Sequence, residues 1–110
     1  MKDNILRENR DFRTLYYRGV SKVSPILIVF ARKNKWGYTR TGITTGKKVG
    51  NAVKRSRCRR VIRAAWQSLA PQVNGSWDLV FVARTRTAFV KSTDVASAME
   101  KLLREAGVIV

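Results

Sequence analysis

The feature that most constrains the fold of this chain is a stripe of apolar residues with helical spacing near its middle. Its members follow the pattern i, i+3, i+4, i+7, i+8 and i+11, so they lie on one face of an α-helix. The stripe consists of Cys58, Val61, Ile62, Ala65, Trp66 and Leu69. It predicts a helix over residues 51–70 that ends before Pro71, because proline cannot continue a helix. A helix with one apolar face needs a second layer to cover that face.

The segments on either side predict that this second layer is a β-sheet. Residues 26–30 and 38–45 are extended in character and are separated by a turn-like segment, so we expect them to form a hairpin. A short strand over residues 20–23 would precede the hairpin. The apolar run at residues 77–83 is typical of a buried strand.

Two more helices are predicted towards the ends of the chain. The first covers residues 9–18, with Asn9 as its N-cap and Gly19 at its end. The last begins at Ser92 or Thr93. Its core face comprises Val95, Met99, Leu102, Leu103 and Ala106. The order of elements predicts an α+β sandwich in which helices pack on one sheet within a single domain.

The charge balance indicates a polyanionic partner. The chain has 23 Lys and Arg against 7 Asp and Glu, a formal net charge of +16, and self-repulsion of that size destabilises a folded chain. Nucleic acid is favoured over a membrane, since the longest apolar run, residues 26–31, is far shorter than the roughly 20 residues of a spanning helix. Lys2 is followed by polar residues, so we expect no signal peptide and a cytoplasmic location.

The cations gather at the start of the central helix. The segment from residue 47 to residue 63 contains no acidic residue, and its cations are Lys47, Lys48, Lys54, Arg55, Arg57, Arg59, Arg60 and Arg63. Like charges repel along a helix, so a run of one sign favours a function over a merely solvated face. Continued backwards, the apolar stripe reaches Arg55 and Lys54, which predicts that the first turns stand clear of the body. Gly46 and Gly50 would let the backbone approach a phosphate closely.

Aromatic residues suggest a second candidate site. Phe12 and Tyr16 lie one helical turn apart, and Ile28 and Phe30 share one face of a predicted strand. Core packing is one interpretation of Phe12, Tyr16 and Phe30. Stacking on bases of single-stranded RNA is the other, and the sequence leaves both open.

Catalytic groups are sparse. The chain has no histidine and one cysteine, Cys58, which we interpret as a small core residue on the stripe. The carboxylates are Asp3, Glu8, Asp11, Asp78, Asp94, Glu100 and Glu105. They are too dispersed to predict a metal site or a two-metal nuclease centre. We therefore expect no catalytic and no metal-ligating residues in the protein.

The segment KKVGNAVKRSRCRRVIRAAW, residues 47–66, resembles the signature of the bacterial ribonuclease P protein family. Residues 6–12 and 77–84 add to the similarity, which covers nearly the whole chain in the right order. One residue departs from the family pattern. Ser56 stands where the middle residue of an arginine–asparagine–arginine triplet is expected, whereas Arg55 and Arg57 are retained.

The resemblance implies one domain over residues 1–110 with the order α-β-β-β-α-β-α. Its four-stranded sheet would contain a left-handed βαβ crossover, as in the second domain of a small-subunit ribosomal protein. It also implies a ribonucleoprotein, in which one protein monomer binds one catalytic RNA subunit. That RNA, with bound Mg²⁺, removes the 5′ leader of precursor tRNA, and the protein alone binds no cofactor.

The resemblance assigns two groups of site residues. Those implied to bind the RNA subunit are Lys47, Lys48, Asn51, Lys54, Arg55, Arg57, Arg59, Arg60 and Arg63. Those implied to hold the single-stranded leader in a cleft are Phe12, Tyr16, Ile28, Phe30 and Thr44. A ribosomal or RNA-chaperone protein would share the charge and size but need no such cleft. A protein-only nuclease is disfavoured by the missing histidines and the dispersed carboxylates.

Overall fold

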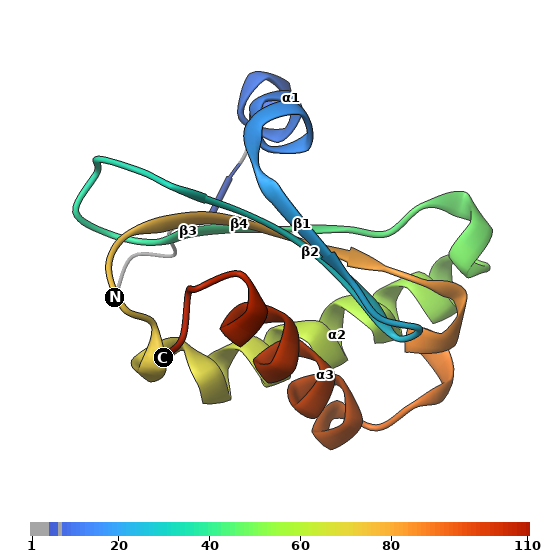
Figure 1. Ribbon diagram of the computed structural model, residues 1–110. Coiled ribbons are helices and arrows are strands. Elements are labelled where there is room, and N and C mark those ends of the chain that lie inside the picture. The colour runs from blue at the N-terminus through green and yellow to red at the C-terminus, as the bar shows by residue number, and fades with distance from the viewer. Residues whose placement is uncertain (1–4, 7) are drawn as a thin grey trace.

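The computed structural model describes residues 5, 6 and 8–110 and has three layers (Figure 1). Helix α1 lies on one face of the sheet, and α2 and α3 lie on the other. In chain order the elements are α1 (Asn9–Arg18), β1 (Val20–Val23), β2 (Leu27–Lys33), β3 (Arg40–Thr44), the 3₁₀ turn η1 (Lys47–Val49), α2 (Ala52–Leu69), η2 (Ala70–Gln72), β4 (Trp77–Ala83), η3 (Thr85–Phe89) and α3 (Ser92–Glu105). The predicted α+β architecture and order of elements are confirmed.

Within the described residues, four strands form one mixed sheet in the order β1-β2-β4-β3. The hairpin is formed by β1 and β2, with Val23 opposite Ile28. Strand β4 is antiparallel to β2 and parallel to β3. The predicted hairpin between residues 26–30 and 38–45 is therefore wrong. The nearly continuous apolar run of β4 is buried on both faces, so β4 takes a central position and separates the two strands.

The main core lies between the sheet and the pair of helices α2 and α3. Alternate residues of β2 and β4 face it: Leu27, Val29, Ala31, Leu79, Phe81 and Ala83. The predicted stripe of α2 is buried there, except that Trp66 is half-buried with its ring 5.5 Å from that of Phe81. The predicted face of α3 is also buried, apart from half-buried Ala106. Each large apolar side chain removed from water stabilises the fold by about 1.5–3 kcal/mol.

A smaller core lies under α1. Leu15 is buried there against Leu6 and Val80. The helix begins at Asn9 and ends at Arg18, as predicted, but its N-cap is Glu8, whose carbonyl accepts hydrogen bonds from the first turn. A Cβ on Gly19 would lie 2.5 Å from the carbonyl oxygen of Leu15, so this helix end requires glycine.

The remaining helix ends differ from prediction by one residue or so. Helix α2 begins at Ala52, after its N-cap Asn51, and ends at Leu69. Helix α3 is capped one residue before the predicted Ser92 or Thr93. The carboxylate of Asp94 accepts the Lys91 backbone N–H at 3.2 Å. No helix in the described part of the chain is both long and apolar enough to cross a bilayer.

Candidate functional site

The predicted RNA-binding cations lie on η1 and along α2. The two lysines on η1, Lys47 and Lys48, are exposed, as are Lys54, Arg59, Arg60 and Arg63, whereas Arg55 and Arg57 are half-buried. Ser56, between the two retained arginines, is exposed. We define the cationic surface as the predicted cations other than Arg57: Lys47, Lys48, Lys54, Arg55, Arg59, Arg60 and Arg63.

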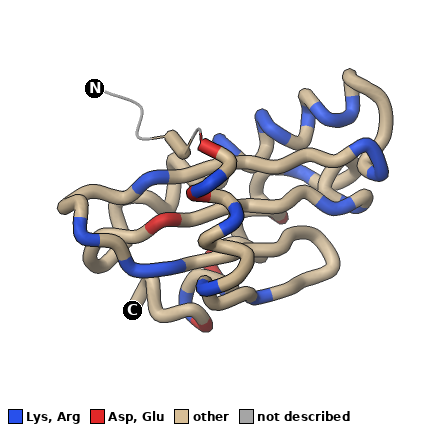
Figure 2. The backbone as a smooth tube through the Cα atoms, turned by 90° about the horizontal axis from the view of Figure 1, so that it is seen from above, with Lys and Arg blue, Asp and Glu red and all other residues tan. Residues whose placement is uncertain are grey.

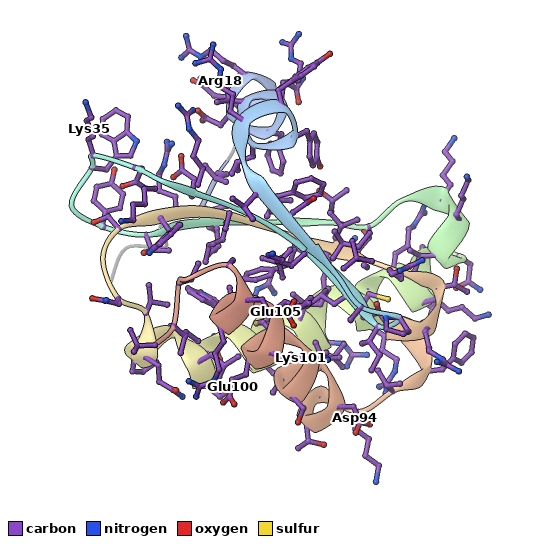
Figure 3. All side chains as sticks on the ribbon, viewed as in Figure 1. Arg18, Lys35, Asp94, Glu100, Lys101 and Glu105 are labelled. Atoms are coloured by element: carbon purple, nitrogen blue, oxygen red, sulfur yellow. The ribbon has the colours of Figure 1, made fainter. Side chains whose placement is uncertain are left out.

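Few acidic residues offset these cations. Asp78 is the only acidic residue in the sequence between Phe12 and Thr93, and it is neutralised by an arginine within the sheet. The other acidic residues of the second half of the chain lie on α3, which carries the labelled side chains of Asp94, Glu100 and Glu105 (Figure 3). In the view from above, Lys and Arg outnumber Asp and Glu along the backbone (Figure 2). The positive potential is therefore not cancelled locally along α2.

The N-terminal end of α2 is built from Gly50, Asn51 and Lys54. The side-chain oxygen of Asn51 accepts the backbone N–H of Lys54 at 3.0 Å, so this predicted RNA-binding residue is also the helix N-cap. Gly50 has φ +138°, a conformation that favours glycine. A Cβ at that position would lie 2.7 Å from Cδ of Lys54. The glycine thus lets the Lys54 side chain pack over the backbone.

Arg57 differs from the other cations because its guanidinium is used inside the protein. Its Nε donates to the carbonyl of Ala88 at 3.0 Å and its Nη2 donates to the carbonyl of Val90 at 3.0 Å. These bonds tie the end of η3 to α2, and η3 also packs against η1. The prediction that the first turns of α2 stand clear of the body therefore holds for the exposed first turn, Ala52 to Lys54, and is wrong for the second turn, which Arg57 ties to η3. A loop with little regular structure leaves carbonyls that need donors, and Arg57 supplies them.

Two consecutive threonines connect α1 and α2 through the end of β3. The hydroxyl groups of Thr44 and Tyr16 are 3.3 Å apart. The Arg59 guanidinium donates to Oγ1 of Thr45 at 2.9 Å. Because α1 and α2 cover opposite faces of the sheet, the end of β3 connects the cationic surface on α2 to the surface beside α1.

A shallow cleft of about 620 Å³ lies beside α1 at this end of the sheet. Its lining residues, which we call the α1 cleft, are Asn9, Phe12, Arg13, Tyr16 and Thr44. Tyr16 is 42% exposed. Phe12 is half-buried, and its ring lies so close to Gly42 that a Cβ there would be 2.8 Å from Phe12 Cζ. The cleft therefore has one open aromatic ring and a second that is shared with the small core.

Phe30 supports the cleft from the sheet. Its ring meets that of Tyr16 edge to face, with centroids 4.9 Å apart and an interplanar angle of 76°. Ile28 is half-buried on the same face of β2 but does not line the cleft. The structure thus brings Phe12, Tyr16, Phe30 and Thr44 together and leaves Ile28 beside them. Phe12 and Phe30 also belong to the small core, so the two interpretations of these aromatics are not exclusive.

Sequence reasoning missed an ion-pair network at the other end of β3. Arg40 binds Asp78 through two hydrogen bonds of 2.9 and 2.8 Å, and Asn34 donates to the same carboxylate at 2.8 Å. Arg40 Nη1 also lies 3.7 Å from the carboxylate of Asp11 on α1. Hydrogen bonding to Asp78 raises the pKa of Arg40 above its already high ordinary value. The network fixes β3 against β4 and holds α1 above the sheet.

Trp36 caps this network from the β2–β3 loop. Its side chain is 59% exposed, in agreement with its position in a polar turn, and the Arg40 guanidinium lies 5.1 Å from its ring centroid. The sequence carried one signal for this network: Asp78 is an isolated acidic residue within the apolar run of β4. The partner of Asp78, however, lies 38 residues away in the sequence.

Cys58 is fully buried in the main core. Burial raises the pKa of its thiol, although the neighbouring charges of Arg57 and Arg59 act in the opposite direction. Among residues 5, 6 and 8–110, no three His, Cys, Asp or Glu side chains come together as a metal site. Asp3 among the carboxylates, and Arg7 within the similar segment 6–12, lie outside the described residues.

The fold and these surfaces first define a class: a small α+β protein that presents a cationic helix next to an aromatic cleft. The family model described as Ribonuclease P matches residues 1–107. The chain belongs to the ribonuclease P protein family, whose members are protein subunits of a tRNA-processing endoribonuclease.

Individual relatives match the chain over 90% or more of its length. A ribonuclease P protein component from Clostridium botulinum (strain 657 / Type Ba4) is 35% identical over 109 residues, which cover 98% of either chain. The structure of the RNase P protein of Staphylococcus aureus matches with a TM-score of 0.86 and 27% identity, covering 99% of this chain and 100% of that one. The structure of the RNase P protein of Thermotoga maritima matches with a TM-score of 0.79 and 27% identity, covering 90% of this chain and 94% of that one.

Proposed function

We propose that this chain binds the catalytic RNA of ribonuclease P through its cationic surface and holds the 5′ leader of precursor tRNA in the α1 cleft. One copy of the chain would assemble with one RNA subunit in the cytoplasm. The complex would remove the leader and give the mature 5′ end of the tRNA. The observation that carries this proposal is the pair of contacts at Thr44 and Thr45, which joins the cleft directly to the cationic helix.

The cationic surface suits a folded RNA. Its arginines can donate two parallel hydrogen bonds to one phosphate, and their planar groups also stack on bases. Arg55, Arg59 and Arg63 follow one another at intervals of one helical turn, so they form a row along α2. A row of this kind can follow the phosphates of an RNA backbone. The Arg59 bond to Thr45 holds one member of the row in place before RNA arrives.

The α1 cleft suits a single strand. Unstacked bases bind proteins by stacking on aromatic rings, while cations beside the rings bind the phosphates. Tyr16 supplies an open ring that is held from below by Phe30, and Arg13 supplies a cation at the cleft wall. Asn9 and Thr44 add polar groups that can bind base edges or the 2′-hydroxyl.

In this proposal the catalytic groups and the Mg²⁺ ions belong to the RNA subunit. The protein contributes binding and electrostatics. Its net charge of +16 lowers the repulsion between the phosphates of two RNA molecules that must come together, so less Mg²⁺ is needed for assembly.

Reconstitution tests the proposal. The chain is mixed with a bacterial ribonuclease P RNA and a precursor tRNA at low millimolar Mg²⁺, and cleavage at the mature 5′ end is followed. We expect cleavage to be faster than with RNA alone, and precursor tRNA to bind more tightly than mature tRNA. No stimulation, together with equal binding of both tRNAs, would indicate a general RNA chaperone. Cleavage by the chain without the RNA subunit would indicate a protein nuclease.

A further inference from the structure

Phe89, at the end of η3, is an exposed aromatic residue that the proposed function does not use. Its side chain is 66% exposed, whereas the two preceding residues, Thr87 and Ala88, are buried. A single exposed apolar side chain is ordinary on a protein surface and carries no conclusion alone. The surroundings of this ring are what distinguish it.

The backbone on both sides of Phe89 is held by one side chain. Arg57 donates to the carbonyls of Ala88 and Val90, which flank Phe89 in the sequence, at 3.0 Å each. Thr87 anchors the same turn, because its hydroxyl donates to the carbonyl of Ile26 and accepts the Arg84 backbone N–H. The ring is thus presented on a rigid support. Binding to it costs little conformational entropy.

The ring also lies against a cation of the α2 end. Nζ of Lys54 is 5.1 Å from the Phe89 ring centroid, and the stem of Lys54 packs against Gly50. From Leu79 to Thr93 the chain has no acidic residue, and η3 adds the exposed Arg86. An open aromatic ring among cations, with its backbone fixed, matches the requirements for stacking an unpaired nucleobase whose phosphate binds beside it.

We infer that Phe89 and Lys54 form a stacking site for one unpaired nucleotide of RNA, separate from the α1 cleft. This inference rests on the proposed function, since it requires that the α2 end meets RNA. Arg57, whose hydrogen bonds hold the backbone beside Phe89, lies on α2 with most of the cationic surface. An unpaired nucleotide of the RNA subunit is therefore the expected occupant. A nucleotide of the leader has the same chemistry, and the test separates the two sources.

The central variant is Phe89→Leu, which keeps an apolar side chain but removes the ring. Its affinity for a bacterial ribonuclease P RNA is measured at several salt concentrations, and its reconstituted complex is titrated with precursor and mature tRNA. We expect a loss of RNA-subunit affinity on the order of tenfold, with an unchanged slope of log affinity against log salt. The slope counts neutralised phosphates, and Phe89→Leu removes none. Phe89→Trp should bind as the wild type does.

Two controls accompany this variant. Lys54→Ala should reduce the salt slope by about one, because it removes one phosphate contact. Trp36→Leu removes another exposed aromatic ring that lies beside an arginine, at the far end of β3, and should leave RNA-subunit affinity unchanged. Thermal unfolding of each variant should match the wild type, since these side chains are exposed.

The outcomes separate this site from the proposed function. A loss by Phe89→Leu for leader-bearing tRNA alone would support the stacking site and assign the nucleotide to the leader. Wild-type affinity of Phe89→Leu for the RNA subunit and for both tRNAs would overturn the site and leave the proposed function standing. The site would also be overturned if Trp36→Leu lost as much RNA-subunit affinity as Phe89→Leu, or if Phe89→Trp failed to bind the RNA subunit. A wild-type chain that does not bind the RNA would overturn both.

Discussion

Thr44 is the last residue of β3 and Thr45 is the next residue in the chain, yet their hydroxyl groups contact helices on opposite faces of the sheet. Thr44 meets Tyr16 on α1, and Thr45 accepts a hydrogen bond from Arg59 on α2. Side chains alternate across a strand, so this division follows from the extended backbone alone. The strand end is therefore where a single strand in the α1 cleft and an RNA bound to α2 would come nearest to each other.

Replacing Tyr16 by alanine should weaken binding of leader-bearing tRNA by about 1–2 kcal/mol, on the order of tenfold, because one stacking ring is lost. Binding of mature tRNA should not change. Fluorescence titration of the reconstituted complex with the two tRNAs measures the difference. Tyr16→Phe keeps the ring and its contact with Phe30, so it should retain nearly all the affinity.

Tyr16 is a cleaner probe than Phe12. Phe12 packs against Gly42 and the small core, so Phe12→Ala is expected to lower the free energy of unfolding as well as leader binding. An equal loss for both tRNAs in Tyr16→Ala would show that the ring serves the fold and not the leader.

Arg57→Ala should mainly lower the free energy of unfolding, whereas Arg59→Ala should mainly weaken RNA binding. Removal of Arg57 leaves the carbonyls of Ala88 and Val90 without donors, at a cost of about 2 kcal/mol in the free energy of unfolding. Removal of exposed Arg59 should change stability by less than about 0.5 kcal/mol and weaken binding to the RNA subunit. Urea unfolding and RNA titration measure the two effects.

Arg57→Lys should not restore the stability of the Arg57→Ala variant. A lysine ammonium lacks the planar fork that reaches both carbonyls. Full stability in Arg57→Ala combined with weak RNA binding would show instead that this arginine binds RNA directly, as the family resemblance implies.

How far the sequence predicts this fold depends on whether a feature is local. The span of α2 and the buried strand β4 follow from periodicity and from an apolar run within one segment, and both were found. The neighbours of β3 could not be found this way, because the pattern within one strand does not specify which distant strand pairs with it. The inward role of Arg57 was hidden for a similar reason. Its acceptors lie 31 and 33 residues away, in a turn without periodicity.

The affinity of the chain for the RNA subunit should fall steeply with salt. If about six phosphates are neutralised, the loss between 50 and 200 mM salt is on the order of a thousandfold. Alanine at Arg60 or Arg63 should each reduce the slope of log affinity against log salt by about one. Alanine at Lys101, an exposed cation on α3, should leave the slope as it is. If alanine at Lys101 lowers this salt slope as much, the RNA is bound by the overall charge of the chain and not by the cationic surface.

The ion pair of Arg40 and Asp78 should couple stability to leader binding. Both side chains are mostly buried, with 18% and 15% exposed, so removal of one partner leaves a charge that is poorly solvated. Asp78→Ala is expected to cost about 3 kcal/mol in the free energy of unfolding, and the double variant with Arg40→Ala less than the sum of the two single changes. A double-mutant cycle from urea unfolding gives the coupling energy.

The leader-binding consequence of the same pair follows from its second contact. Arg40 also lies 3.7 Å from Asp11 of α1, so Asp78→Ala frees the arginine and loosens the position of the helix that carries Tyr16. Leader-bearing tRNA should therefore bind this variant more weakly at a temperature where the chain remains folded. Asp11→Asn is the matched control, because it removes the contact with α1 while the Arg40–Asp78 pair stays intact. If Asp11→Asn lowers leader affinity without lowering stability, the link runs through α1; if neither variant affects leader affinity, the pair serves only to fix β3 against β4.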